Sequence, residues 1–204
     1  FGLMDAQGNA LPIKTDSEQV RDDLIILDRA SMRVTFQGIA QAPLPSLLRD
    51  FSAPIKLQYD YDDAQLALML AHDENAFNRW DAGQQLYTRY ILALVDDASF
   101  ALPESLLTSI GNVLIQDGDP ALKAEQLTLP SFDELLELFE QIDPICLLDA
   151  IKQMKLFIAH GMADKLIVQY QALHGKPYQS DGRSIAERAL KNVCLSYLSM
   201  LPTH

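Results

Sequence analysis

The sequence predicts an α+β chain with two domains, a small and partial antiparallel β-sandwich over residues 1–61 and a mainly α-helical antiparallel array over residues 62–204. Apolar and polar residues alternate in several short stretches before residue 60, as in half-buried strands. After Asp62 the apolar residues recur every three or four positions, as on one face of a helix. Apolar residues make up 49% of the 204, enough for a substantial core.

The first sixty residues predict about six short strands. Gly8 and Asn9 tolerate the positive φ of a tight turn, so residues 1–13 are expected to form a hairpin that turns over Asp5–Asn9. Residues 16–23 are expected to form an exposed loop. The remaining predicted strands cover residues 24–28, 33–39, 47–51 and 54–60. A complete sandwich needs about 100 residues, so we expect this sheet to lack its first strands.

The two periods meet without a flexible linker. Ile55, Leu57 and Tyr59 alternate with polar residues, whereas Leu66 and Met69 follow the helical spacing. Pro54 stiffens the entry to the last predicted strand, and Asp62 or Asp63 can cap the first helix. We therefore expect a direct strand-to-helix connection that fixes the angle between the domains, which a Gly/Ser linker would not do.

Residues 62–204 predict about eight helices joined by short loops, which favours antiparallel neighbours stacked in pairs. Pro103, Asp119-Pro120 and Asp143-Pro144 mark helix starts. Two capping boxes are predicted at Ser131 and Ser184, and Gly161 is expected to break the helix that begins after Asp143. No fixed repeat period is evident, so the sequence alone predicts no named repeat.

The net charge of the chain disfavours two classes of partner. The chain carries 16 basic and 28 acidic side chains, a net charge of −12. This sign disfavours nucleic acid and anionic membrane surfaces. No apolar run is long enough to cross a bilayer and no signal peptide is evident, so a cytoplasmic location is expected. Cys146 and Cys194 are predicted to be buried free thiols.

No residue pattern predicts a catalytic, cofactor-binding or metal site. The histidines at 72, 160, 174 and 204 include no pair four residues apart and no H-E-x-x-H frame, so we expect them at the surface or at helix ends. The aspartates at 60, 62, 63, 96 and 97 are predicted to be solvated charges or helix caps. Asp117-Gly118-Asp119 carries only a weak trace of a calcium loop.

Five longer strings nevertheless resemble one family. They are FSAPIKL (51–57), NAFNRWDAGQQL (75–86), LTLPS (127–131), FEQIDPI (139–145) and IAERALKNVCLSYL (185–198). Together with FGLMDAQGN they resemble bacterial aminopeptidase N, the zinc-dependent alanyl aminopeptidase of the gluzincin type, over essentially the whole chain. The match covers the end of the family's Ig-like β-sandwich domain and the first part of its helical domain.

The resemblance implies a non-catalytic C-terminal fragment of an enzyme that releases N-terminal residues from peptides. The family's zinc motif and its G-[AG]-M-E-N motif have no counterpart here, so no catalytic residue carries over. The resemblance implies a superhelical cap that limits access to the active site, with the parent's catalytic domain as partner and peptide substrate only indirectly. It also implies that the helical domain continues past His204. The alternative is a stand-alone helical-repeat module that binds another protein.

Overall fold

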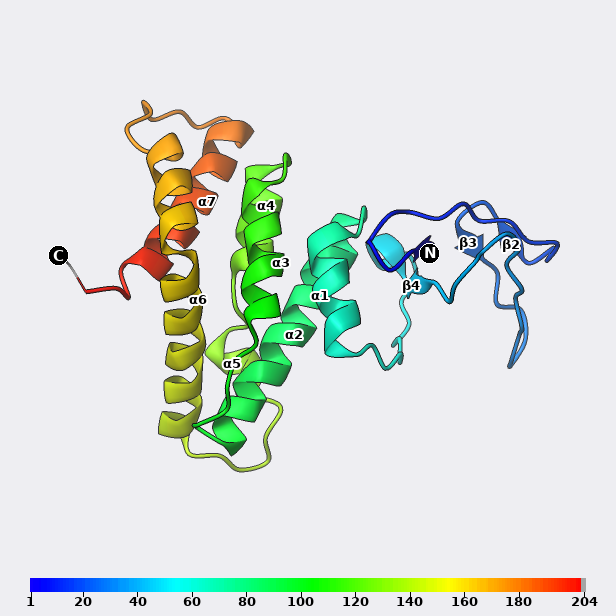
Figure 1. Ribbon diagram of the computed structural model, residues 1–204, viewed down its shortest axis with the longest axis horizontal. Coiled ribbons are helices and arrows are strands. Elements are labelled where there is room, and N and C mark those ends of the chain that lie inside the picture. The colour runs from blue at the N-terminus through cyan, green and yellow to red at the C-terminus, as the bar shows by residue number, and fades with distance from the viewer. Residues whose placement is uncertain (203–204) are drawn as a thin grey trace.

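The computed structural model describes residues 1–202 as a small β region at one end of a helical array (Figure 1). The β region lies beside α1, and α6 and α7 lie at the far end. The described residues form seven α-helices: α1 (Asp63–His72), α2 (Ala76–Asp96), α3 (Glu104–Ile115), α4 (Pro120–Leu127), α5 (Phe132–Leu136), α6 (Pro144–Leu173) and α7 (Gly182–Leu198). The predicted fold class, a partial β region followed by a helical array, is confirmed.

The β region contains two small antiparallel sheets. In the first, β1 (Gly2–Met4) pairs with β4 (Leu44–Ser46), with Leu3 opposite Pro45. In the second, β2 (Val20–Arg21) pairs with β3 (Leu24–Ile25). Met4 also forms a bridge to Ala10 around a turn in which the Asp5 carboxylate accepts from two backbone amides, as the predicted hairpin requires.

Several predicted strands are wrong. Residues 33–39 and 54–60 contain no strand, and residues 49–51 form the 3₁₀ turn η1 (Arg49–Phe51). β2 falls in the segment predicted to be a loop. Ile55 and Leu57 are 56% and 40% exposed, because the described chain places no neighbouring strand over the apolar face that their alternation creates. The alternation is present in the sequence, but no strand within residues 1–202 pairs with it.

Most helices begin where the sequence predicts. Asp62 and Ser131 each form a capping box, and Asp119 and Asp143 cap helices whose first residue is proline. The second predicted capping box is wrong: α7 begins earlier, and Asp181 accepts from the Ser184 backbone amide at 3.0 Å. An aspartate three residues upstream supplies the same acceptor one turn sooner.

Gly161 does not break a helix. α6 runs without interruption over 30 residues from Pro144 to Leu173. Gly161 lies against the Leu107 side chain of α3, where a Cβ would be 2.9 Å from Leu107 Cδ2 and 3.1 Å from Cγ. The glycine therefore permits close approach of two helices, and the packing outweighs its poor helix propensity.

One apolar core runs through the array. α2 contacts α1, α4 and α6, and α7 packs on α4 and α6. Leu66, Leu86, Ile91 and Leu166 are fully buried in this core. Cys194 is buried as predicted, and its burial raises the pKa of the thiol to about 11. Cys146 is exposed, contrary to the prediction, because it follows Pro144 on the outer side of the first turn of α6. None of the helices described is long and apolar enough to cross a membrane.

Candidate functional site

The contact between the β region and the helices is built from buried polar side chains. Ser46 at the end of β4 is fully buried, and its hydroxyl accepts from Asn78 Nδ2 of α2 at 2.9 Å. Asn78 Nδ2 also donates to the Leu47 carbonyl at 2.8 Å, and Tyr61 donates its hydroxyl to the Pro45 carbonyl at 2.8 Å. The Leu47 carbonyl is therefore satisfied by a side chain of α2, and the Pro45 carbonyl by Tyr61, which immediately precedes the Asp62 cap of α1.

Arg49 and Asp73 form the ion pair of this contact. The Arg49 guanidinium donates to Asp73 Oδ1 at 3.2 Å and to Ser46 Oγ at 2.9 Å. The Asp73 side chain is fully buried at the end of α1, and the Arg49 side chain is 19% exposed. Asp73 Oδ1 also accepts from the Asn75 backbone amide, but Asp73 Oδ2 has no hydrogen-bond partner among residues 1–202. Gly2 of β1 lies directly on the guanidinium, which leaves no room for a side chain there.

The contacts of Arg49 with Asp73 and of Asn78 with Ser46 fix the β region against the helices. The strand predicted over residues 54–60 does not do so. Residues 52–60 have no regular secondary structure and are mostly exposed. The backbone just before them is held tightly instead, with Leu48, Asp50 and Phe51 at φ between 51° and 56°. Non-glycine residues occupy this region only when surrounding contacts impose it. Asn75 supplies two of these contacts, because its amide donates to Asp50 Oδ1 and accepts from the Asp50 amide.

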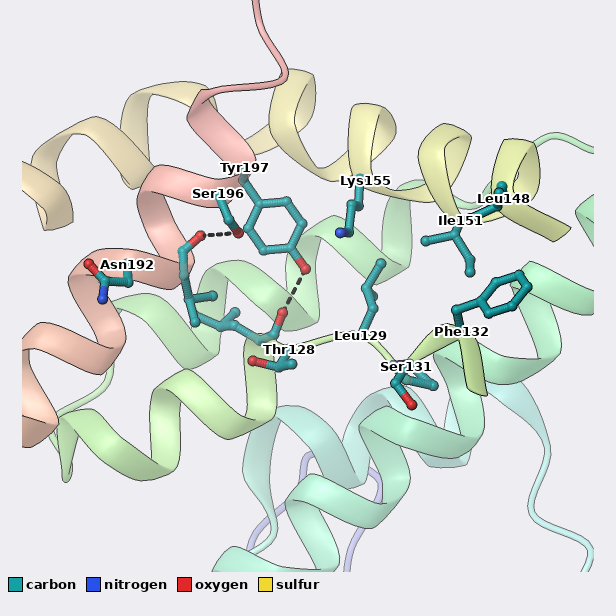
Figure 2. A pocket seen from close by; sticks show the side chains of 13 residues that line it. Thr128, Leu129, Ser131, Phe132, Leu148, Ile151, Lys155, Asn192, Ser196 and Tyr197 are labelled. Atoms are coloured by element: carbon teal, nitrogen blue, oxygen red, sulfur yellow. Dashed lines mark hydrogen bonds between the residues drawn. The ribbon is translucent and has the colours of Figure 1, made fainter. Parts of the chain in front are cut away.

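A pocket lies between the end of α4, the loop that follows it, α6 and α7. Its volume is about 550 Å³. Leu129, Phe132, Ile151 and Tyr197 give it apolar walls, and Figure 2 shows Lys155 of α6 pointing toward Leu129. The serine hydroxyls in the wall are engaged in helix ends, for example Ser131 with Glu134. Among the described residues that line the pocket, no serine is paired with a general base.

Two buried tyrosines donate hydrogen bonds to carbonyls at the end of α4, because the last carbonyls of a helix lack partners within it. Tyr197 of α7 donates its hydroxyl to the Leu127 carbonyl at 2.6 Å, as Figure 2 shows, and Tyr87 of α2 donates to the Gln126 carbonyl at 2.8 Å. Burial raises the pKa of both hydroxyls, so both remain protonated donors. The pocket wall is therefore held by hydrogen bonds from two other helices.

Replacing Tyr197 with Phe should lower the free energy of unfolding by about 1–2 kcal/mol, because the Leu127 carbonyl would stay buried without a donor. Urea denaturation measures this change. Tyr178→Phe is the matched control, since Tyr178 is 79% exposed, and it should change stability by less than about 0.5 kcal/mol. Equal effects of the two substitutions would contradict the assigned role of the Tyr197 hydroxyl.

The three histidines that the structure describes do not come together. His72 ends α1 and His174 caps the end of α6, while His160 lies inside the continuous α6 rather than at its end. His204 lies outside the described residues. Within residues 1–202, no three His, Cys, Asp or Glu side chains are grouped so that they could hold a metal ion. That no residue forms a catalytic site stays a prediction.

The aspartates at 60, 62, 63, 96 and 97 are exposed. Asp62 caps α1, and Asp63 pairs with Arg89 at 3.0 Å. The loop at Asp117-Gly118-Asp119 borders a small hollow that Arg79 and Lys123 also line. Two neighbouring cations oppose calcium binding there.

No local pattern indicates the Arg49–Asp73 pair or the pocket. Asp73 and Asn75 lie in the short Asp-Glu-Asn connection between two helices, and that polar connection was the one available signal. Their partners, Arg49 for Asp73 and Asp50 for Asn75, are 24 and 25 residues away. Leu129, Lys155 and Tyr197 likewise come from three distant segments.

Two family models match this chain. Residues 1–60 match a domain of unknown function with an Ig-like fold (DUF3458), and residues 63–204 match a domain of unknown function described as ARM repeats (DUF3458_C). ARM repeats stack helices into a superhelix, in agreement with the successive helix contacts described above.

Individual relatives extend over nearly the whole chain. Aminopeptidase N of Escherichia coli is 35% identical over 99% of this chain, and aminopeptidase N of Haemophilus influenzae is 34% identical over 97%. The crystal structure of Legionella pneumophila aminopeptidase A in complex with aspartic acid covers 98% of the chain with a TM-score of 0.82 and 26% identity. The chain spans about a quarter of the length of these relatives. The chain therefore belongs to the DUF3458_C family, and it is homologous to the C-terminal region of bacterial aminopeptidase N, where the end of the Ig-like portion meets the ARM-repeat helices.

Proposed function

We propose that this chain is a non-catalytic part of a zinc-dependent aminopeptidase N that releases N-terminal amino acids from peptides. Residues 1–61 are a partial β-sandwich domain, and residues 62–204 are the first portion of a helical domain. The helical domain caps the active site and limits access to it. Its partner is the catalytic domain of the same polypeptide, and peptide substrate meets it only indirectly.

The match with aminopeptidase N of Escherichia coli carries this proposal, since it includes 99% of the chain. A cap needs a stable shape rather than reactive groups. The continuous core from α1 to α7 and the polar junction at Arg49–Asp73 provide a stiff body of this kind. The acidic character of the chain favours approach of the positively charged amine of a peptide.

The residues described here do not fit zinc. A catalytic zinc site needs three protein ligands such as two histidines and a carboxylate. His72, His160 and His174 lie on separate parts of α1 and α6, and none is grouped with two other candidate ligands. The proposal therefore assigns zinc to the catalytic domain of the parent and no step of hydrolysis to this chain.

Hydrolysis of alanyl-p-nitroanilide tests the assignment. The purified 204-residue chain should show no turnover and should carry far less than one zinc per chain by elemental analysis. A longer polypeptide that includes a catalytic domain should be active, and deletion of residues 63–202 from it should raise its activity on folded proteins relative to tripeptides. Turnover by the short chain, or unchanged size selectivity after the deletion, would contradict the proposal.

The second candidate is a stand-alone helical-repeat module that binds another protein. The match to ARM repeats favours it, because such repeats present extended binding surfaces. Light scattering separates the candidates. An incomplete sheet should drive self-association through its exposed apolar residues, whereas an independent module should be monodisperse.

A further inference from the structure

A hollow with aromatic walls lies where the β region meets α2. Its volume is about 260 Å³. Tyr59 and Tyr61 form one wall with ring centroids 4.3 Å apart, and Phe51 and Phe77 form another with centroids 5.8 Å apart. Aromatic faces carry negative electrostatic potential and attract cations.

One carboxylate lines this hollow without a cationic partner. Asp81 of α2 accepts a hydrogen bond from Gln85 Nε2 at 2.7 Å, and none of the ion pairs within residues 1–202 includes it. Burial raises the pKa of Asp81, as expected for a carboxylate that has lost water and has no cation beside it. A carboxylate and aromatic rings around one hollow are the groups that hold a guanidinium or an ammonium.

The surface beside the hollow is apolar. A second hollow of about 370 Å³ shares Ile55 and Leu57 with the first and continues to Leu24 and Leu27. Leu27 is 67% exposed, and Phe51 is 57% exposed. Large apolar side chains gathered on one face indicate a surface that another chain segment covers.

We propose that this surface receives an extended polypeptide segment, and that an arginine or lysine side chain of that segment enters the hollow and pairs with Asp81. The apolar neighbours of the basic residue cover Leu27, Ile55 and Leu57. The segment comes from the longer polypeptide, because the relatives are about four times as long as this chain. This source rests on the proposed function, whereas the recognition of a basic side chain rests on the hollow alone.

Peptide titration of the 204-residue chain tests the proposal. The probe is acetyl-Val-Arg-Val-amide, and its neutral counterpart is acetyl-Val-citrulline-Val-amide. Trp80 reports binding by fluorescence, because it is the single tryptophan, adjoins Asp81 and lies 5.7 Å from the Phe77 ring. Amide NMR shifts at Asp81, Gln85 and Phe77 provide the second readout.

The arginine peptide should bind about tenfold more tightly than the citrulline peptide, as one partly desolvated charge pair provides. Asp81→Asn should abolish this preference, while Asp149→Asn on the exposed side of α6 should keep it. Asp81→Asn retains an acceptor for Gln85, and a urea curve verifies that it folds. Equal binding of the two peptides, no binding of either, or a preference that survives Asp81→Asn would overturn the proposal. The hydrolysis test above is unaffected by any of these results.

Discussion

Replacing Asp73 with Ala should release the β region from the helices. The substitution removes the acceptor for the Arg49 guanidinium and for the Asn75 amide. Breaking a buried pair by removing one partner costs about 3–5 kcal/mol, and the 19% exposure of Arg49 places the expected loss at about 2–3 kcal/mol. Hydrogen exchange should show faster opening of the amides in 44–51, whereas the amides of α4, α6 and α7 keep their protection.

Two controls test whether the Arg49–Asp73 pair holds the β region on the helices. Asp28→Ala removes an ion pair of the same kind at the surface, with side chains about half exposed, and should have no measurable effect. Arg49→Ala combined with Asp73→Ala should cost less than the sum of the single changes, because the two side chains interact directly. Unchanged exchange in 44–51, or strictly additive changes, would show that the pair does not hold the junction.

The helices could be predicted because their signals are local. The aspartate and serine caps lie within four residues of the amides they satisfy, and the apolar stripes need no knowledge of the neighbouring helix. The strands could not be predicted in the same way. Alternation at Ile55, Leu57 and Tyr59 describes only half of a strand pair, and the described chain places no strand beside it.

The sites could not be predicted because they join distant segments. Arg49 meets Asp73, and the aromatic hollow joins residues 47–61 to α2. No short motif records these contacts, and Asp81 looks like any other helix-surface acid in sequence. The strings 51–57 and 75–86, which resemble aminopeptidase N, border this hollow, but the resemblance assigned no role to their residues.

Gly161→Val should destabilise the array by about 2–3 kcal/mol. A Cβ at this position overlaps the Leu107 side chain, which is 7% exposed and would have to shift within its packed surroundings. Overpacking of this kind costs about 1–3 kcal/mol, and valine adds a further branch. Gly161→Ala should also destabilise the protein, although alanine gains about 1 kcal/mol in helix propensity over glycine. Thermal or urea denaturation of the helical array measures both changes.

A second substitution tests whether overlap with Leu107 causes the destabilisation by Gly161→Val. Leu107→Ala leaves a cavity when Gly161 is present, but in combination with Gly161→Val it removes the overlap and provides space for the new methyl groups. The double variant should therefore be more stable than the sum of the two single changes predicts. Gly182→Ala, in the first turn of α7 with no atom within 4 Å of the new methyl group, should leave stability unchanged or raise it slightly. Stabilisation by Gly161→Ala would contradict the prediction, because it would show that α3 and α6 leave room for a methyl group between Gly161 and Leu107.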